Sequence, residues 1–187
     1  KFQKKPQLIA PNVKVLTDGF NYGNNLALNI QTMNVEKSDQ LPKGTYTSIA
    51  GNKATAWGLI AAAEKCGKRL FLGSYPITPA TDIMHELAAR KDMGVMVVQA
   101  EDEIAGVCTA IGAAFAGDLA ATSTSGPGLS LKSEAIGLAV MAELPLVVID
   151  VQRGGPSTGL PTKTEQTDLM QALYGRNGEC PAVVMAA

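Results

Sequence analysis

Apolar residues along most of this chain follow two alternating patterns, short continuous runs and a three-to-four-residue spacing. The runs predict buried strands at residues 69–73, 95–99, 119–123 and 146–151, with a last strand that begins at Pro181. The helical spacing predicts helices at residues 53–66, 78–90, 104–115 and 165–174, and another that follows Gly128 and ends before Pro145. Because strands alternate with helices, we expect an α/β fold whose parallel sheet is flanked by helices on both faces.

The first part of the chain does not follow this alternation. An apolar stripe through residues 12–33 predicts one amphipathic helix, and the polar segment at residues 35–47 indicates a linker. We therefore divide the chain into residues 1–46, from a preceding domain, and an α/β domain at residues 47–187. Because the chain begins with Lys1 and ends in an apolar stretch, we expect a piece of a longer protein, truncated on the C-terminal side of this domain.

Composition narrows the classes of function. A net charge of −1 over 187 residues gives no indication that nucleic acid or an anionic membrane is the main partner. The longest apolar stretch, residues 135–151, is interrupted by Glu143 and Pro145 and does not predict a membrane span. The cysteines lie far apart without a CxxC pair, which favours a reducing, cytoplasmic location and argues against an iron–sulfur or zinc site in this chain.

Three carboxylates, Glu101, Asp102 and Glu103, stand where the second predicted strand runs into a helix. Carboxylates at such a place commonly cap the helix, because its exposed N–H groups and its dipole favour negative charge. The same place is the carboxyl end of a strand, which is where open α/β sheets bind their ligands. Spacing alone leaves both interpretations open.

Four polar or glycine-rich loops follow the predicted strands, at residues 74–79, 101–103, 122–128 and 152–155. Because the carboxyl ends of parallel strands share one edge of a sheet, we expect these loops to converge there.

Two nucleotide-binding signatures are incomplete in this region. Leu160 and Pro161 stand where a phosphate loop needs Lys and Ser or Thr, and Leu131 takes the third glycine position of a dinucleotide-binding turn.

The stretches SYPITP, QAEDEIAG, TSTSGPG and QRGGPSTGLPTKTEQTDL, in this order and spacing, resemble the α subunit of the 2-oxoacid:ferredoxin oxidoreductases. The resemblance runs from Ser48 to the end and is to the 2-oxoglutarate type, in the form whose γ domain is fused ahead of α. Residues 1–46 resemble the last helix of that γ domain. The resemblance implies the pyrimidine-binding domain for thiamine diphosphate (ThDP), in an enzyme that oxidatively decarboxylates a 2-oxoacid, forms an acyl-CoA and reduces ferredoxin.

The resemblance also implies roles for individual residues. Glu103 matches the carboxylate that hydrogen-bonds the pyrimidine ring, with Glu101 as the alternative. Thr78 and Arg153 match substrate contacts, Thr78 through its hydroxyl and Arg153 through a guanidinium fork. Residues 154–163 are either a mobile cover over the substrate or an ordinary surface loop. Contacts to the cofactor are implied for Glu103, Tyr75, Pro76, Ile77, Ser125, Gly126 and Pro127.

Several parts of such an enzyme are missing from this sequence. It has no GDG-type segment followed by paired asparagines for Mg²⁺ and the diphosphate, and no cysteine cluster for a [4Fe–4S] centre. The resemblance therefore implies a β-type partner subunit that carries these groups, in a dimer of heterodimers that also binds coenzyme A and ferredoxin. The small residues at 106–114 are a candidate contact for that partner, and the fragment alone is expected to be inactive.

Three alternatives to this interpretation stay open. The chain could belong to a pyruvate or branched-chain 2-oxoacid enzyme, because its loops do not specify the acyl group. It could instead be a non-catalytic α/β docking module. The third alternative is a nucleotide-binding module.

Overall fold

The computed structural model describes residues 3–26, 36, 42–155, 163, 165–176, 179–181 and 183–186, in two compact units at residues 1–46 and 47–187. The first unit contains helix α1 (Ile9–Asn25), which begins earlier than predicted and has no buried residue. The predicted end of this helix and linker residues 35 and 37–41 lie outside the described residues. In the described ranges, no helix is long and apolar enough to cross a membrane.

The second unit confirms the predicted α/β fold. Its four parallel strands lie in the order β2-β1-β3-β4, and a helix follows each of β1, β2 and β3 and leads to the next strand along the chain. In chain order the elements are α2 (Gly51–Cys66), β1 (Leu70–Ser74), α3 (Thr81–Ala88), β2 (Met96–Gln99), α4 (Glu103–Phe115), β3 (Leu119–Thr124), α5 (Gly126–Met141), β4 (Val147–Asp150) and α6 (Leu169–Tyr174).

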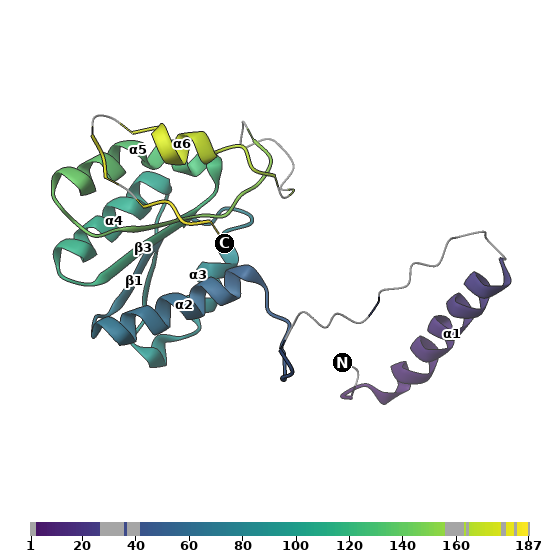
Figure 1. Cartoon of the computed structure of the whole chain (residues 1–187). Coiled ribbons are helices and arrows are strands. Elements are labelled where there is room, and N and C mark those ends of the chain that lie inside the picture. Colours follow the sequence, from purple (N-terminus) through teal and green to yellow (C-terminus); the bar gives the residue numbers. More distant parts are fainter. Residues whose placement is uncertain are drawn as a thin grey trace. The chain divides into compact units, whose positions relative to one another are not determined.

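The sheet is covered on both faces, with α2 and α3 on one side and α4 and α5 on the other (Figure 1). Successive residues of β1 point to opposite faces, as expected for a strand. Leu70 and Leu72 pack in the core under α2 and α3, whereas Phe71 packs against Ala110 of α4 and its neighbours. This burial on both sides explains why the strands are apolar runs rather than alternating patterns.

Small residues let α4 lie directly on β1. A Cβ at Gly73 would meet the Oγ1 of Thr109 at 2.2 Å, and a Cβ at Gly106 would meet the Cα of Ser74 at 3.1 Å. Gly106, together with the buried Ala110, therefore faces the sheet. The prediction that residues 106–114 offer a small-residue face to a partner is wrong for most of this stretch, because the sheet already occupies that face.

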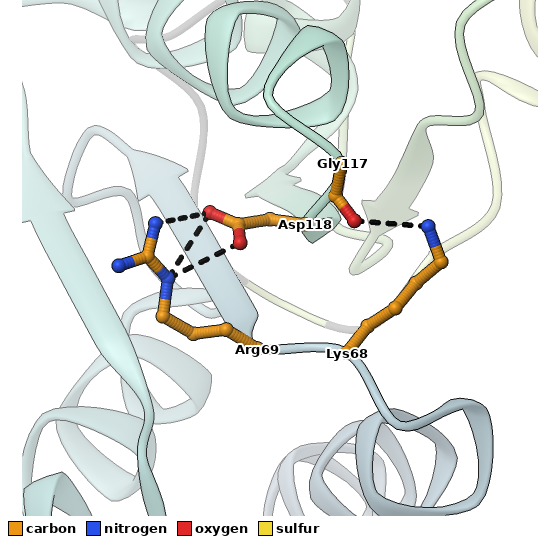
Figure 2. Close-up of polar contacts among 4 residues, drawn as sticks. All are labelled: Lys68, Arg69, Gly117 and Asp118. Carbon is orange, nitrogen blue, oxygen red and sulfur yellow. Dashed lines mark hydrogen bonds and ion pairs between the residues drawn. The ribbon is translucent and has the colours of Figure 1, made fainter.

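Charged side chains join the amino ends of β1 and β3 (Figure 2). Arg69 binds the carboxylate of Asp118 through its Nη2 at 2.7 Å and its Nε at 3.2 Å, and Lys68 donates to the carbonyl of Gly117 at 2.9 Å. A cavity of about 550 Å³ lies at this edge, lined in part by Lys68 and Arg69. Because these two cations are already bound within the chain, the cavity gives no indication of a ligand site.

The opposite, carboxyl edge contains the switch point of the sheet. The chain leaves β1 toward α3 on one face and leaves the neighbouring β3 toward α5 on the other, so the two loops diverge. Open α/β sheets bind ligands in the crevice between such loops. At its floor the buried Ser74 donates to the carbonyl of Ser123 at 2.6 Å, and the two hydroxyl oxygens lie 2.9 Å apart.

Three predicted elements differ from the observed ones. Helix α3 begins at Thr81 and not at Thr78. The carbonyl of Pro79, before the helix, accepts a hydrogen bond from Asn52 of α2 at 2.7 Å. Helix α6 begins at Leu169 rather than at residue 165. The predicted strand from Pro181 is wrong for the described residues 181 and 183–186, which pair with no strand and lie largely exposed.

Candidate functional site

The three carboxylates before α4 have different surroundings. Asp102 is the N-cap of α4, and its side chain accepts a hydrogen bond from the backbone N–H of Ala105 at 2.7 Å. Glu101 and Asp102 are exposed, whereas Glu103 is only 8% exposed. Capping therefore explains Asp102 and leaves Glu103, a buried carboxylate, without that role.

Glu103 lies against the first turn of α5. A Cβ at Gly128 would come within 2.9 Å of the Glu103 Cγ and 3.4 Å of its Oε1, and within 2.1 Å of the Thr124 Oγ1. Glycine at position 128 is thus what leaves room for the Glu103 side chain. Within the described residues, no hydrogen bond to the Glu103 carboxylate is present, so its oxygens are available to an outside donor.

A buried lysine completes this contact. Lys132 of α5 donates from its Nζ to the backbone carbonyl of Glu103 at 2.9 Å and to the Thr122 Oγ1 at 3.1 Å. Burial lowers the pKa of Lys132 to about 8, against the opposing charges of Glu103 and Asp102. The sequence did not point to Lys132 as a site residue. Its only indication in the sequence is a lysine among the mostly small and apolar residues that follow the SGPG turn.

The start of α5 holds three of the residues matched to cofactor contacts, Ser125, Gly126 and the half-buried Pro127. Ser125 precedes the helix and is fully buried, and its Oγ has no hydrogen-bond partner among the described atoms. Its carbonyl accepts hydrogen bonds from Gly128 and Leu129. Gly126 is also buried and lies against the carboxylate of Asp168, which a Cβ at Gly126 would meet at 2.8 Å.

The structure brings Thr78 and Arg153 together across the sheet. Arg153 follows β4, is 5% exposed, and donates from Nη1 to the backbone carbonyl of Thr78 at 2.9 Å. The side chain of Thr78 is exposed, as is that of Tyr75, while Pro76 and Ile77 are half-buried. This hydrogen bond joins the loop after β4 to the loop after β1. The sequence did not indicate this structural contact.

The ends of the predicted cover lie side by side. The N–H of Gly154 donates to the carbonyl of Lys163 at 2.8 Å, and Thr167 Oγ1 donates to the carbonyl of Arg153 at 3.3 Å. Residues 156–162 and 164 lie outside the described part of the chain, so the cover over the substrate stays a prediction.

Two acidic side chains meet beside this loop. Asp150, at the end of β4, lies near Asp168, which precedes α6 and is 4% exposed. Burial raises the pKa of Asp150 to about 8, and the neighbouring Asp168 carboxylate adds to the rise. Asp150 therefore keeps its proton at neutral pH, which allows the two carboxyl groups to lie close together.

Comparisons with known proteins show which proteins this chain is similar to. The profile of the family described as pyruvate flavodoxin/ferredoxin oxidoreductase, thiamine diphosphate-binding, matches residues 62–187. The 2-oxoglutarate oxidoreductase subunit KorA of Mycobacterium tuberculosis is 58% identical over 186 residues, which cover 100% of this chain and 28% of that protein. The 2-oxoglutarate synthase subunit KorA of Archaeoglobus fulgidus is 47% identical over 139 residues, 74% of this chain and 39% of that protein.

A solved structure also matches. The 2-oxoglutarate:ferredoxin oxidoreductase from Magnetococcus marinus, with 2-oxoglutarate, coenzyme A and succinyl-CoA bound, is 42% identical and superposes with a TM-score of 0.63. The match covers 88% of this chain and 28% of that one. The chain thus spans less than half the length of each of these relatives.

Proposed function

Because the chain belongs to the pyruvate flavodoxin/ferredoxin oxidoreductase family, through its thiamine diphosphate-binding domain, we propose that it is the pyrimidine-binding part of a 2-oxoglutarate:ferredoxin oxidoreductase α subunit. The whole enzyme would convert 2-oxoglutarate and coenzyme A to succinyl-CoA and CO₂, and pass the electrons to ferredoxin. The relatives described above are named for 2-oxoglutarate, which favours this substrate over pyruvate or a branched-chain 2-oxoacid.

The observation that best supports the proposal is the buried carboxylate of Glu103 at the carboxyl edge of the sheet. Its oxygens accept no hydrogen bond within the described residues, and Gly128 keeps the space beside them clear of a side chain. The unsatisfied hydroxyl of Ser125 lies on the same turn. A flat ring with nitrogen donors fits such a crevice, so these residues suit the aminopyrimidine of ThDP.

Bound there, ThDP would supply the electron sink that decarboxylation of a 2-oxoacid requires. Glu103 would hydrogen-bond the pyrimidine ring nitrogen and share a proton with it, in a place where water is largely excluded. Glu101 is exposed and cannot take this role without a rearrangement. Ser125, Gly126 and Pro127 would lie along the ring, with glycine allowing close approach.

The substrate would lie between the loops after β1 and β4. Arg153 supplies a guanidinium, which binds carboxylates through paired hydrogen bonds, and Thr78 supplies an exposed hydroxyl beside it. Tyr75, Pro76 and Ile77 would form the wall that separates this substrate from the cofactor. The contact between Arg153 and the Thr78 carbonyl would hold both donors in one place.

The remaining parts would belong elsewhere in the assembly. We assign Mg²⁺, the diphosphate and the [4Fe–4S] centre to a β-type partner, because this chain lacks the segments that bind them. The first 46 residues would come from a γ domain fused ahead of α, in a cytoplasmic dimer of heterodimers.

The proposal is tested by assaying the complete α subunit with its β partner against a panel of 2-oxoacids, with coenzyme A and ferredoxin present. We expect 2-oxoglutarate to give the highest kcat/KM. A preference for pyruvate or a branched-chain 2-oxoacid would correct the substrate. If no 2-oxoacid is turned over and the chain alone binds ATP or NAD, the nucleotide-binding alternative is right instead.

A further inference from the structure

Lys132 is the largest fully buried side chain in the described part of the chain, with 0% exposure. Its two hydrogen-bond acceptors, the Glu103 carbonyl and the Thr122 hydroxyl, are uncharged, and none of the salt bridges among the described residues includes it. Burying an ammonium group is costly, and an unbranched apolar side chain could fill the same space. The charge of Lys132 therefore calls for a reason beyond packing.

The position of Lys132 on its helix suggests that reason. Gly128 and Lys132 are four residues apart, so they lie one above the other on the side of α5 that faces α4. Gly128 makes room for the Glu103 side chain, and Lys132 reaches the Glu103 backbone. One face of α5 thus clears space for the carboxylate and places a cation next to the residue that carries it.

The charged groups around Lys132 single out Glu103. The acidic groups that face it come from α4, namely Glu103, Asp102 and the thiol of Cys108, while β3 contributes the uncharged Thr122. Asp102 is exposed and its carboxylate caps α4, whereas Glu103 is buried. With a pKa of about 8, Lys132 is mostly a cation at neutral pH, so Glu103 is the buried carboxylate that its charge stabilises.

We propose that Lys132 is a positioning residue that keeps the proton shared by Glu103 and the cofactor on the pyrimidine nitrogen rather than on the carboxylate. This inference rests on the proposed function of Glu103. A nearby cation favours the ionised carboxylate over the carboxylic acid, so the shared proton moves toward the ring nitrogen and no other bond changes. Without that charge the proton moves toward Glu103, and the ring is activated less.

The test uses three variants of the complete α–β enzyme. Lys132→Met removes the charge and keeps the length of the side chain. Thr122→Val removes one hydrogen bond of the same network but keeps the ammonium. Lys91→Met removes an exposed lysine that follows α3, and serves as the matched control for the substitution itself.

The first readout needs no turnover. With ThDP and Mg²⁺ bound and substrate absent, circular dichroism of the bound cofactor is followed against pH, because it reports the protonation state of the aminopyrimidine. We expect the midpoint for loss of the shared proton to move upward by about one pH unit in Lys132→Met, because this variant lacks the cation that favours the ionised carboxylate. In Thr122→Val and Lys91→Met it stays where the wild type has it.

The second readout is the division of the effect between kcat and KM. Since Lys132 is fully buried and is not among the proposed substrate or cofactor contacts, we expect kcat for 2-oxoglutarate to fall about tenfold while KM stays within about twofold of the wild type. The acidic limb of the kcat profile should move in the same direction as the spectroscopic midpoint.

The outcomes separate this inference from the proposed function. A wild-type complex that fails to bind ThDP overturns the function itself. If the wild type binds ThDP normally and the midpoint is unchanged in Lys132→Met, only the proposed role of Lys132 is overturned. This holds even if Lys132→Met binds ThDP more weakly, because lost packing would lower the affinity without shifting the titration midpoint. Should Lys132→Met not assemble, Lys132→Gln keeps a hydrogen-bond donor without the charge, and the same shift or its absence decides.

Discussion

Burial distinguishes Glu103 from the two acids that precede it. All three stand at the same helix start, but Asp102 already caps the helix and Glu101 is exposed. A buried carboxylate with no hydrogen bond from the described residues has a reason to be there only when something else supplies a donor. At the scale of single residues, this contrast is the basis for assigning the cofactor contact to Glu103.

Replacement of Glu103 by Gln tests that assignment. Gln keeps the size of the side chain but cannot exchange a proton with the ring, so we expect kcat to fall about 10²- to 10⁴-fold. The matched variant Glu101→Gln should retain near-normal turnover, since Glu101 is exposed. Steady-state kinetics of the assembled enzyme decides, and the assignment fails if Glu101→Gln is the variant that loses activity.

Arg153 has both a structural and a proposed binding role. Lys in its place could still donate to the Thr78 carbonyl but could not form a two-pronged contact with a carboxylate. We expect Arg153→Lys to raise KM for 2-oxoglutarate about tenfold or more, with a smaller change in kcat. Initial rates over a range of substrate concentrations measure this, and an unaltered KM would show that Arg153 does not bind the substrate.

At the scale of elements, the first two turns of α5 gather most of the site. Ser125 and Gly126 start the helix, Gly128 admits the Glu103 side chain, and Lys132 reaches back to the start of α4. These contacts depend on α4 and α5 lying side by side, which the small residues of α4 allow. The pair of helices, rather than any single loop, thus shapes the crevice.

Two glycines of α5 provide a matched test of this packing. Ala at position 128 would place its Cβ 2.1 Å from the Thr124 Oγ1 and 2.9 Å from the Glu103 Cγ, whereas a Cβ at Gly137 meets nothing within 4 Å. We expect Gly128→Ala to weaken ThDP binding about tenfold or more by displacing Glu103. Gly137→Ala should leave binding unchanged and stabilise the helix by up to about 1 kcal/mol. Calorimetric titration and thermal unfolding measure the two effects, and equal ThDP affinity in both variants would contradict the account.

The junction between β4 and α6 predicts a pH dependence. The folded state raises the pKa of Asp150 from 3.8 to about 8, so it keeps a proton that the unfolded chain has released between those values. Stability is therefore lost as pH rises from about 4 to about 8. Asp150→Asn removes this dependence, so the unfolding temperature at pH 8 should rise relative to the wild type while that at pH 4 changes little. If the unfolding temperature of Asp150→Asn falls between pH 4 and pH 8 by as much as that of the wild type, Asp150 is ionised in the folded protein.

Periodicity predicted the four strands of the sheet, and parallel topology predicted the convergence of their loops at one edge. Helix capping was one of two interpretations of the three carboxylates, and the structure assigns the cap to Asp102. Lys132 was not found, because its burial depends on the packing of α5 against α4 and β3. The start of α3 was predicted too early, at Thr78. The small residues of α4 were predicted to contact a partner subunit, because a sequence does not show which face of a helix packs against the sheet.

At the scale of the whole molecule, we interpret the carboxyl edge of the sheet as one half of a shared site. Glu103 and Arg153 are the proposed contacts there for a pyrimidine and for a carboxylate, whereas the sequence has no GDG-type segment followed by paired asparagines for a diphosphate and its metal ion. The chain also spans only 28% of its relative from Mycobacterium tuberculosis. We therefore expect ThDP to bind the assembled enzyme and not this chain alone, which calorimetric titration with and without the β partner would show. Tight binding by the isolated chain would contradict this division of the site.

A structure of the complete α–β enzyme with ThDP bound would show directly whether Glu103 contacts the pyrimidine ring. The account predicts that the Glu103 carboxylate lies within about 3 Å of the pyrimidine ring nitrogen, with Gly128 beside it and Lys132 behind it. A structure in which Glu103 faces solvent, or in which another carboxylate contacts the ring, would contradict it.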